Sequence, residues 1–127
     1  MSTANDIQHG GDHYKKQKIQ HWDFVVKHKL NYLEGCATKY ISRHRDKNGL
    51  EDLKKAGHYV LKIKELFLAG QYAPSFNGDE SDCGIFCRSN ELTPRDQDAF
   101  SAVCLWRDEN DLHRALGSID NLITQYT

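Results

Sequence analysis

The sequence predicts an all-α protein. Apolar residues recur at intervals of three and four along several segments, and residues that begin or end helices separate these segments. No pair of strand-like segments joined by a turn stands out. We therefore expect a helical hairpin core with additional C-terminal helices and no significant sheet.

The first half of the chain contains a leader and three predicted helices. Residues 1–12 are polar and include two adjacent glycines, a composition that predicts a flexible leader. Helical spacing is present over about 20–29, 31–47 and 50–69. The turn between the second and third helices is short, so we expect them to form an antiparallel hairpin within a domain of residues 13–70.

The second half, residues 71–127, predicts an acidic loop followed by a helical extension that packs on the same domain. Proline, glycines and acidic residues over 71–90 indicate a loop of roughly 20 residues, in which 83–87 is a short ordered segment. A Thr-Pro pair at 93–94 is typical of a helix start. A last helix is expected over about 110–125.

Charge and composition limit the possible functions. The 17 Lys and Arg nearly balance the 18 Asp and Glu, for a net charge of -1, which argues against a general nucleic-acid coat. Basic residues gather in 14–64 and acidic residues in 79–120. The sequence contains no apolar run of membrane-spanning length and no secretory leader, so we expect a soluble, cytoplasmic protein with no membrane partner. We therefore expect the four cysteines to be reduced thiols.

A line of polar and cationic residues marks the second predicted helix. Asn31, Gly35, Lys39 and Arg43 are four residues apart and share one helix face, and Lys47 continues the spacing. Cations at a helix C-terminus suit the helix dipole and form a candidate anion site. The alternative is a solvated surface, which is the commoner role of such charges.

The start of the third helix brings further candidates to the same neighbourhood. Asp52 and Lys55 are three residues apart, and His58-Tyr59 follow one turn later. If the hairpin forms, these groups stand beside Lys39 and Arg43. Together they would stabilise a transferring phosphoryl group by position and charge.

Other nucleotide and metal chemistries find less support. Neither a P-loop nor a GxGxxG motif is present. MazG-type pyrophosphohydrolases are an all-α alternative, but they need clustered helix carboxylates to hold Mg²⁺. Here the two central helices offer only Glu34, Glu51, Asp52 and Glu65.

The cysteines predict no metal site. The spacing Cys83-x3-Cys87 leaves structural zinc open as the alternative to free buried thiols, and no second close pair of Cys or His follows it. Cys36 and Cys104 fall on predicted apolar faces, so we expect both in the core. We therefore assign no metal ligands.

One set of motifs resembles a known family. The motifs are His13-Tyr14, Asn31-x3-Gly35-x3-Lys39-Tyr40-x2-Arg43-x3-Lys47 and Asp52-Leu53-x-Lys55-Ala56-x2-Tyr59. Over about residues 9–69 this pattern resembles a small phage-encoded family long catalogued as a domain of unknown function. Some of its members are described as nucleotide kinases that phosphorylate deoxynucleoside monophosphates without a P-loop.

The resemblance implies a nucleotide-binding, nucleoside monophosphate kinase-like protein. It implies catalytic roles for Lys39, Arg43 and Asp52. It implies substrate binding by His13, Tyr14, Asn31, Lys47, Lys55 and Tyr59. The phosphoryl donor would be a nucleoside triphosphate, ATP or a dNTP, with Mg²⁺ left open.

Two other hypotheses for the function remain besides the kinase. One is a non-catalytic sponge or regulator that sequesters a signalling nucleotide, and the other is a protein-interaction module. In each nucleotide reading we expect a homo-oligomer in the host cytoplasm, because so small a core needs partners to wall off a pocket.

Overall fold

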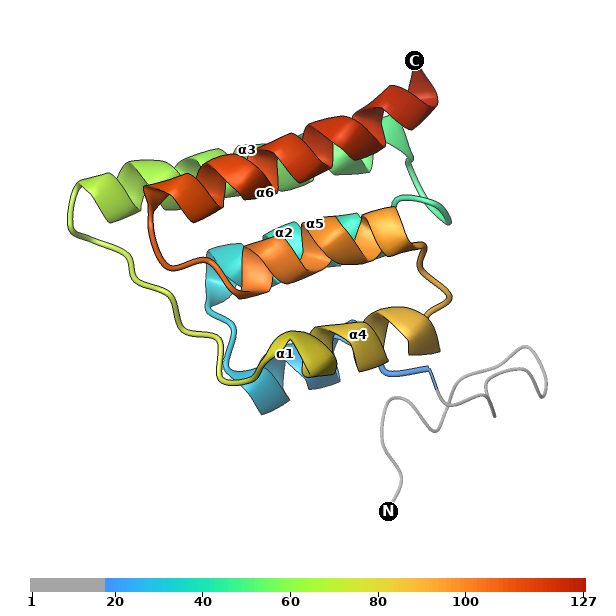
Figure 1. Ribbon diagram of the computed structural model, residues 1–127, viewed down its shortest axis with the longest axis horizontal. Coiled ribbons are helices and arrows are strands. Elements are labelled where there is room, and N and C mark those ends of the chain that lie inside the picture. Colours follow the sequence, from blue (N-terminus) through green and yellow to red (C-terminus); the bar gives the residue numbers. More distant parts are fainter. Residues whose placement is uncertain (1–17) are drawn as a thin grey trace.

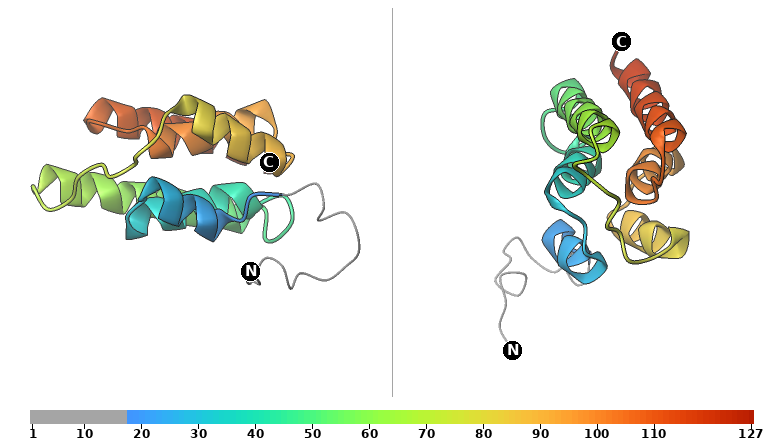
Figure 2. Two further views of the ribbon diagram at one scale, coloured as in Figure 1. Left: turned by 90° about the horizontal axis from the view of Figure 1, so that it is seen from below. Right: turned by 90° about the vertical axis from the view of Figure 1, so that its left-hand side faces the viewer.

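Two layers of three helices make up the fold. The structure is a computed structural model that describes residues 18–127. One layer contains α1 (His21–His28), α2 (Tyr32–Arg43) and α3 (Leu50–Leu68), and the other contains α4 (Glu80–Ser89), α5 (Pro94–Cys104) and α6 (Glu109–Ile123). Across the layers, α3 packs on α6 and α2 packs on α5 (Figures 1 and 2). No strand occurs within residues 18–127, so the all-α prediction is confirmed.

Reciprocal side-chain caps fix the starts of three helices. In each, the side chain of the N-cap residue and that of the residue three positions later each accept a hydrogen bond from the other's backbone N–H. The pairs are Asn31 with Glu34, Asp79 with Asp82, and Thr93 with Asp96. The third pair precedes a proline at the first turn of α5, which confirms the helix start predicted at 93–94.

The prediction for residues 71–90 was wrong in part, because α4 forms over Glu80–Ser89. Two signals were present in the sequence: the Asp79–Asp82 capping box and an apolar stripe. Cys83, Phe86 and Cys87 have helical spacing and are buried. The central glycine of that segment and the surrounding acidic residues concealed this pattern.

The second helix is also shorter than expected. α2 ends at Arg43, and 44–49 form turns in which the Gly49 N–H donates to the His44 carbonyl at 2.9 Å. Gly49 has φ +56°, a conformation that glycine adopts at low cost, and a Cβ there would lie 3.1 Å from Tyr126 Cε1. Lys47 therefore leaves the helical line predicted for it and lies exposed in the turn.

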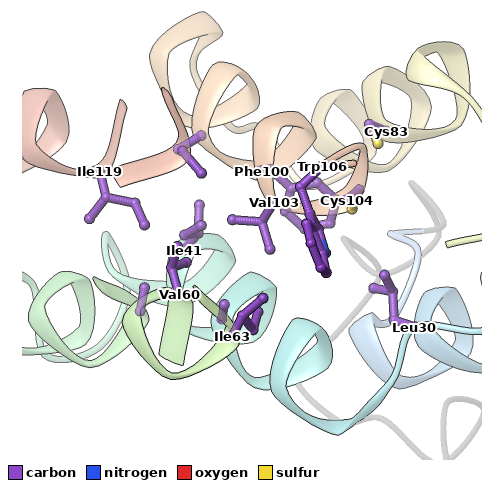
Figure 3. Packing of buried hydrophobic residues seen from close by; sticks show 14 of the residues in the cluster. Leu30, Ile41, Val60, Ile63, Cys83, Phe100, Val103, Cys104, Trp106 and Ile119 are labelled. Carbon is purple, nitrogen blue, oxygen red and sulfur yellow. The ribbon is translucent and has the colours of Figure 1, made fainter. Parts of the chain in front are cut away.

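Apolar side chains from both layers meet in one core. Ile41, Val60 and Ile63 of α2 and α3 lie opposite Val103 and Ile119 of α5 and α6 (Figure 3).

No helix within residues 18–127 combines the length and the apolar character needed to span a membrane.

The cysteines only partly follow the predicted pattern. Cys104 is buried as expected, and Cys83 and Cys87 are free buried thiols. Cys36 was placed in the core by its spacing, but it is only half-buried, because it faces outward between α1 and α2.

A buried carboxylate joins α2 to the second layer. Glu34 is fully buried, and one of its oxygens accepts the Trp106 indole N–H at 2.7 Å. The other accepts the Ser75 hydroxyl at 2.6 Å and the Asn31 N–H at 3.1 Å. Glu34 thereby holds the α3–α4 connection and the α5–α6 connection against the start of α2.

Candidate functional site

Three cations gather around one tyrosine ring on the outer face of the α2–α3 hairpin. Lys39 Nζ, Arg43 Cζ and Lys55 Nζ lie 4.9, 5.2 and 5.4 Å from the centroid of the Tyr40 ring. Each distance is within the range of a cation–π contact. We call Lys39, Tyr40, Arg43 and Lys55 the Tyr40 cluster.

The two helices create this cluster by their antiparallel packing. Lys39, Tyr40 and Arg43 fall on one face of α2, because residues three and four apart are neighbours on a helix. Lys55 comes from the second turn of α3, which is antiparallel to α2. Three positive charges on one partly exposed ring repel one another unless an anion lies among them.

An open hollow of about 340 Å³ adjoins the cluster. Its lining residues are Leu33, Tyr40, Lys55, His58, Tyr59 and Lys62. The Tyr40 and Tyr59 rings stack at 5.9 Å with an interplanar angle of 12° and form its aromatic wall. Among these lining residues, Lys62 alone forms an ion pair within residues 18–127. Its Nζ lies 3.0 Å from Oε2 of the exposed Glu65. No carboxylate among the described residues lines the hollow, so it is electropositive.

Asp52 holds Arg43 in place. The Asp52 Oδ2 atom lies 3.3 Å from Arg43 Nε and accepts the Asn48 N–H at 3.0 Å. The carboxylate is fully buried, and its Oδ1 atom has no hydrogen-bond partner in the described part of the chain. Asp52 thus contacts Arg43 and the turn rather than Lys55, and it orients a cation of the cluster from behind.

Replacing Arg43 with alanine is expected to lower the free energy of unfolding by about 1–3 kcal/mol, because buried Asp52 would lose its charged partner. Lys39→Ala is the matched control: Lys39 is exposed on the same helix, and its loss should change stability by less than about 0.5 kcal/mol. Urea denaturation of both variants measures the difference. The double variant Arg43→Ala/Asp52→Asn should recover part of the loss; equal stability of the two single variants would contradict the role of Asp52.

The other two basic residues at the end of α2 join the helical layers. His44 is buried, and its Nε2 lies 2.7 Å from Asp96 Oδ1 while its Nδ1 lies 2.7 Å from the Tyr126 hydroxyl. Arg45 Nε donates to Asp96 Oδ2 at 2.6 Å. Burial raises the pKa of the Asp96 carboxyl, but the hydrogen bonds from His44, Arg45 and Thr93 outweigh it and hold the pKa well below its usual range. His44 and Arg45 are therefore committed to the fold.

The remaining predicted site residues lie in different environments. The Asn31 side chain caps α2, donates to the Ala73 carbonyl at 3.1 Å and accepts from the Tyr72 hydroxyl, so its polar atoms are used within the fold. Lys47 is exposed in the α2–α3 turn and has no ion-pair partner within residues 18–127. His13 and Tyr14 lie outside the described residues. The structure thus brings together Lys39, Arg43, Lys55 and Tyr59, with Asp52 behind them.

Two features of this region were missed by sequence reasoning. Tyr40 belongs to the family motif but was not among the predicted site residues, yet its ring is the point on which the cations converge. Lys62 was not considered, although it follows Lys55 by seven residues, two turns along the same face of α3.

The carboxylates needed by the MazG-type alternative do not come together. Glu34 is buried against Trp106, Asp52 contacts Arg43, Glu65 pairs with Lys62, and Glu51 is exposed. No group of three or more His, Cys, Asp or Glu side chains in residues 18–127 is arranged to hold a metal ion.

Comparison with known proteins gives one match. Residues 8–61 match a family described as a protein of unknown function, DUF3310. The matched segment includes the Tyr40 cluster, Asp52 and Tyr59, and it ends before Lys62 and the second helical layer. Neither the curated proteins nor the solved structures contain a match.

Proposed function

We propose that this protein binds a nucleoside phosphate at the Tyr40 cluster and transfers a phosphoryl group to a (deoxy)nucleoside monophosphate. The observation that carries the proposal is the convergence of three cations on one ring, beside a hollow that no carboxylate of residues 18–127 lines. Arg presents a planar fork that suits phosphate oxygens and Lys a point charge. The family resemblance of these residues supports the kinase reading.

In this proposal Lys39, Arg43 and Lys55 bind phosphate oxygens, and Asp52 positions Arg43. The family resemblance also assigns substrate binding to Lys47, which is exposed in the α2–α3 turn, and to His13 and Tyr14, which lie outside the described residues. The donor is ATP or a deoxynucleoside triphosphate. The bond between the terminal phosphorus of the donor and its bridging oxygen breaks as a phosphate oxygen of the acceptor bonds to that phosphorus. The products are two nucleoside diphosphates.

The protein's contribution to this reaction would be position and charge. Phosphoryl transfer needs little covalent chemistry from an enzyme beyond in-line placement and neutralisation of the developing charge. Any Mg²⁺ would take part of its ligands from the nucleotide phosphates, as it does in kinase sites. The dependence of the rate on added Mg²⁺ measures this directly.

A non-catalytic nucleotide-binding sponge or regulator is the second candidate. One observation favours it: the carboxylate nearest the Tyr40 cluster in residues 18–127, Asp52, is buried and bonded to Arg43. It is thus unavailable as a base. Such a protein would hold its nucleotide, including a signalling nucleotide of host defence, without turning it over.

Three measurements separate these functions. The protein is incubated with each nucleoside monophosphate and either ATP or a deoxynucleoside triphosphate, and the products are resolved by chromatography. Diphosphate formation supports the kinase. Tight calorimetric binding with the nucleotide recovered intact supports the sponge, and no shift in melting temperature across the panel rejects both.

The setting of the protein is also part of the proposal. The family resemblance supports a phage origin and a place in the host cytoplasm. An open hollow is easily completed by a second copy, so we expect a homo-oligomer. Light scattering during size-exclusion chromatography measures its mass.

A further inference from the structure

A second, apolar hollow lies beside the Tyr40 cluster, between α1 and α2. This groove has a volume of about 290 Å³ and is lined mainly by apolar and aromatic side chains. The lining residues of this α1–α2 groove include Trp22, Val25, Val26, Tyr32, Cys36 and Lys39. Trp22 is 58%, Val26 78% and Tyr32 74% exposed, so large apolar surfaces stand at the rim.

The groove and the cluster are continuous along α2. Lys39 lines the groove, and its Nζ lies 4.9 Å from the Tyr40 ring. Cys36 also lines the groove, and its side chain raises the pKa of the Tyr32 phenol and of the Tyr59 phenol in the neighbouring hollow. From Tyr32 to Arg43 the helix advances roughly 16 Å at 1.5 Å per residue. This face of α2 is therefore aromatic at its N-terminal end and cationic at its C-terminal end.

Two polar side chains of the groove, His21 and Asn31, already have partners within the fold. His21 Nε2 lies 2.8 Å from the Thr38 hydroxyl, and the Asn31 side chain is bonded to the α3–α4 connection. Burial, followed by the charge of Lys39, lowers the pKa of His21 to about 4, so its ring is neutral at pH 7. Apart from Lys39 at its border with the Tyr40 cluster, the groove offers a ligand mainly apolar and aromatic surface.

We infer that the α1–α2 groove binds the base of the nucleoside phosphate, against Trp22 and Tyr32, while its phosphates occupy the Tyr40 cluster. This inference rests on the proposed function. A ligand that is aromatic at one end and anionic at the other matches both the order of the two hollows and Lys39 between them. Stacking on an aromatic side chain strengthens the binding of a base roughly tenfold to a hundredfold.

The test compares ligands with and without a base. Calorimetry on the full chain measures the dissociation constants of the four deoxynucleoside monophosphates and of 2-deoxyribose 5-phosphate. Trp22→Ala and Tyr32→Ala should each weaken the best-bound nucleotide about tenfold or more and change the sugar phosphate by less than twofold. Trp22→Phe should keep most of the affinity, and Leu68→Ala, an exposed apolar residue outside the groove, is the matched control.

Fluorescence gives a second readout that a structural role would not produce. The chain has two tryptophans, and Trp106 is buried. The difference between the emission of the wild type and of Trp22→Phe reports on Trp22. A stacked base should quench this difference signal, and 2-deoxyribose 5-phosphate should not.

The possible outcomes are distinct. If the wild type binds nucleotides but the Trp22 and Tyr32 variants bind them equally well, the base subsite is wrong and the proposed function stands. If the wild type binds neither nucleotides nor the sugar phosphate, the proposed function itself fails. Equal weakening of both kinds of ligand, or conversion of an oligomer to monomers by Trp22→Ala, makes the groove a structural or subunit contact and overturns the inference.

Discussion

Glu34→Ala is expected to lower the free energy of unfolding by about 3–5 kcal/mol, a large part of the stability of a domain this size. The Glu34 carboxylate is fully buried and accepts hydrogen bonds from three parts of the chain. Its removal leaves the Trp106 indole N–H and the Ser75 hydroxyl buried without their acceptor and opens a cavity beside α2. Urea denaturation followed by circular dichroism measures the loss.

Two further variants control this experiment. Glu34→Gln keeps the volume and one acceptor oxygen, so it should cost less than the alanine variant, about 1–2 kcal/mol. Glu51→Ala removes an exposed carboxylate near the start of α3 and should change stability by less than about 0.5 kcal/mol. A Glu34→Ala protein as stable as Glu51→Ala would show that Glu34 does not join the layers.

Glu34 also shows where sequence reasoning reached its limit. From the sequence it was the one carboxylate that the central helix offered to the MazG-type alternative, and it was assigned no role. Its partner Trp106 is 72 positions away along the chain, and no local pattern pairs them. Buried polar contacts of this kind depend on how the two layers meet, which spacing within one helix does not specify.

The helices themselves were largely predictable because their signals are local. The Thr-Pro start of α5 and the apolar spacing of α3 and α6 lie within the helices that they define. The missed α4 had a local signal as well, the Asp79–Asp82 capping box. The signal that ends α2 is not local, because it depends on a residue far along the chain. His44 and Arg45 follow the last residue of the helix and bond to Asp96 of α5.

The candidate site was also predictable only where its signals are local. The line of Lys39 and Arg43 follows from helix geometry, and the short turn predicts that Lys55 lies near them. The sequence does not show which cations lie at the Tyr40 cluster and which bond to the second helical layer. Arg43 and Arg45 are both arginines near the end of the predicted helix, yet Arg45 is bonded to Asp96 of the second layer, whereas Arg43 lies beside the Tyr40 ring with Asp52 behind it.

The double variant Lys39→Glu/Lys55→Glu is expected to weaken nucleotide binding at least 100-fold. A charge-assisted hydrogen bond contributes about 1.5–3 kcal/mol, and two carboxylates in place of the lysines add repulsion of the phosphates. Both lysines are exposed, so the fold should be preserved. Calorimetry with the tightest-binding nucleotide, beside a urea denaturation of the same sample, measures affinity and stability together.

The matched control is Lys27→Glu/Lys54→Glu, which reverses two exposed lysines outside the Tyr40 cluster. Each substitution lowers the charge by two units, so both double variants change the formal net charge from -1 to -5. If long-range charge alone attracted the nucleotide, the two proteins would lose affinity equally, and the loss would shrink as salt is added. A loss confined to Lys39 and Lys55 instead requires direct contact with the phosphates, because within residues 18–127 only those two ammonium groups lie beside the Tyr40 ring.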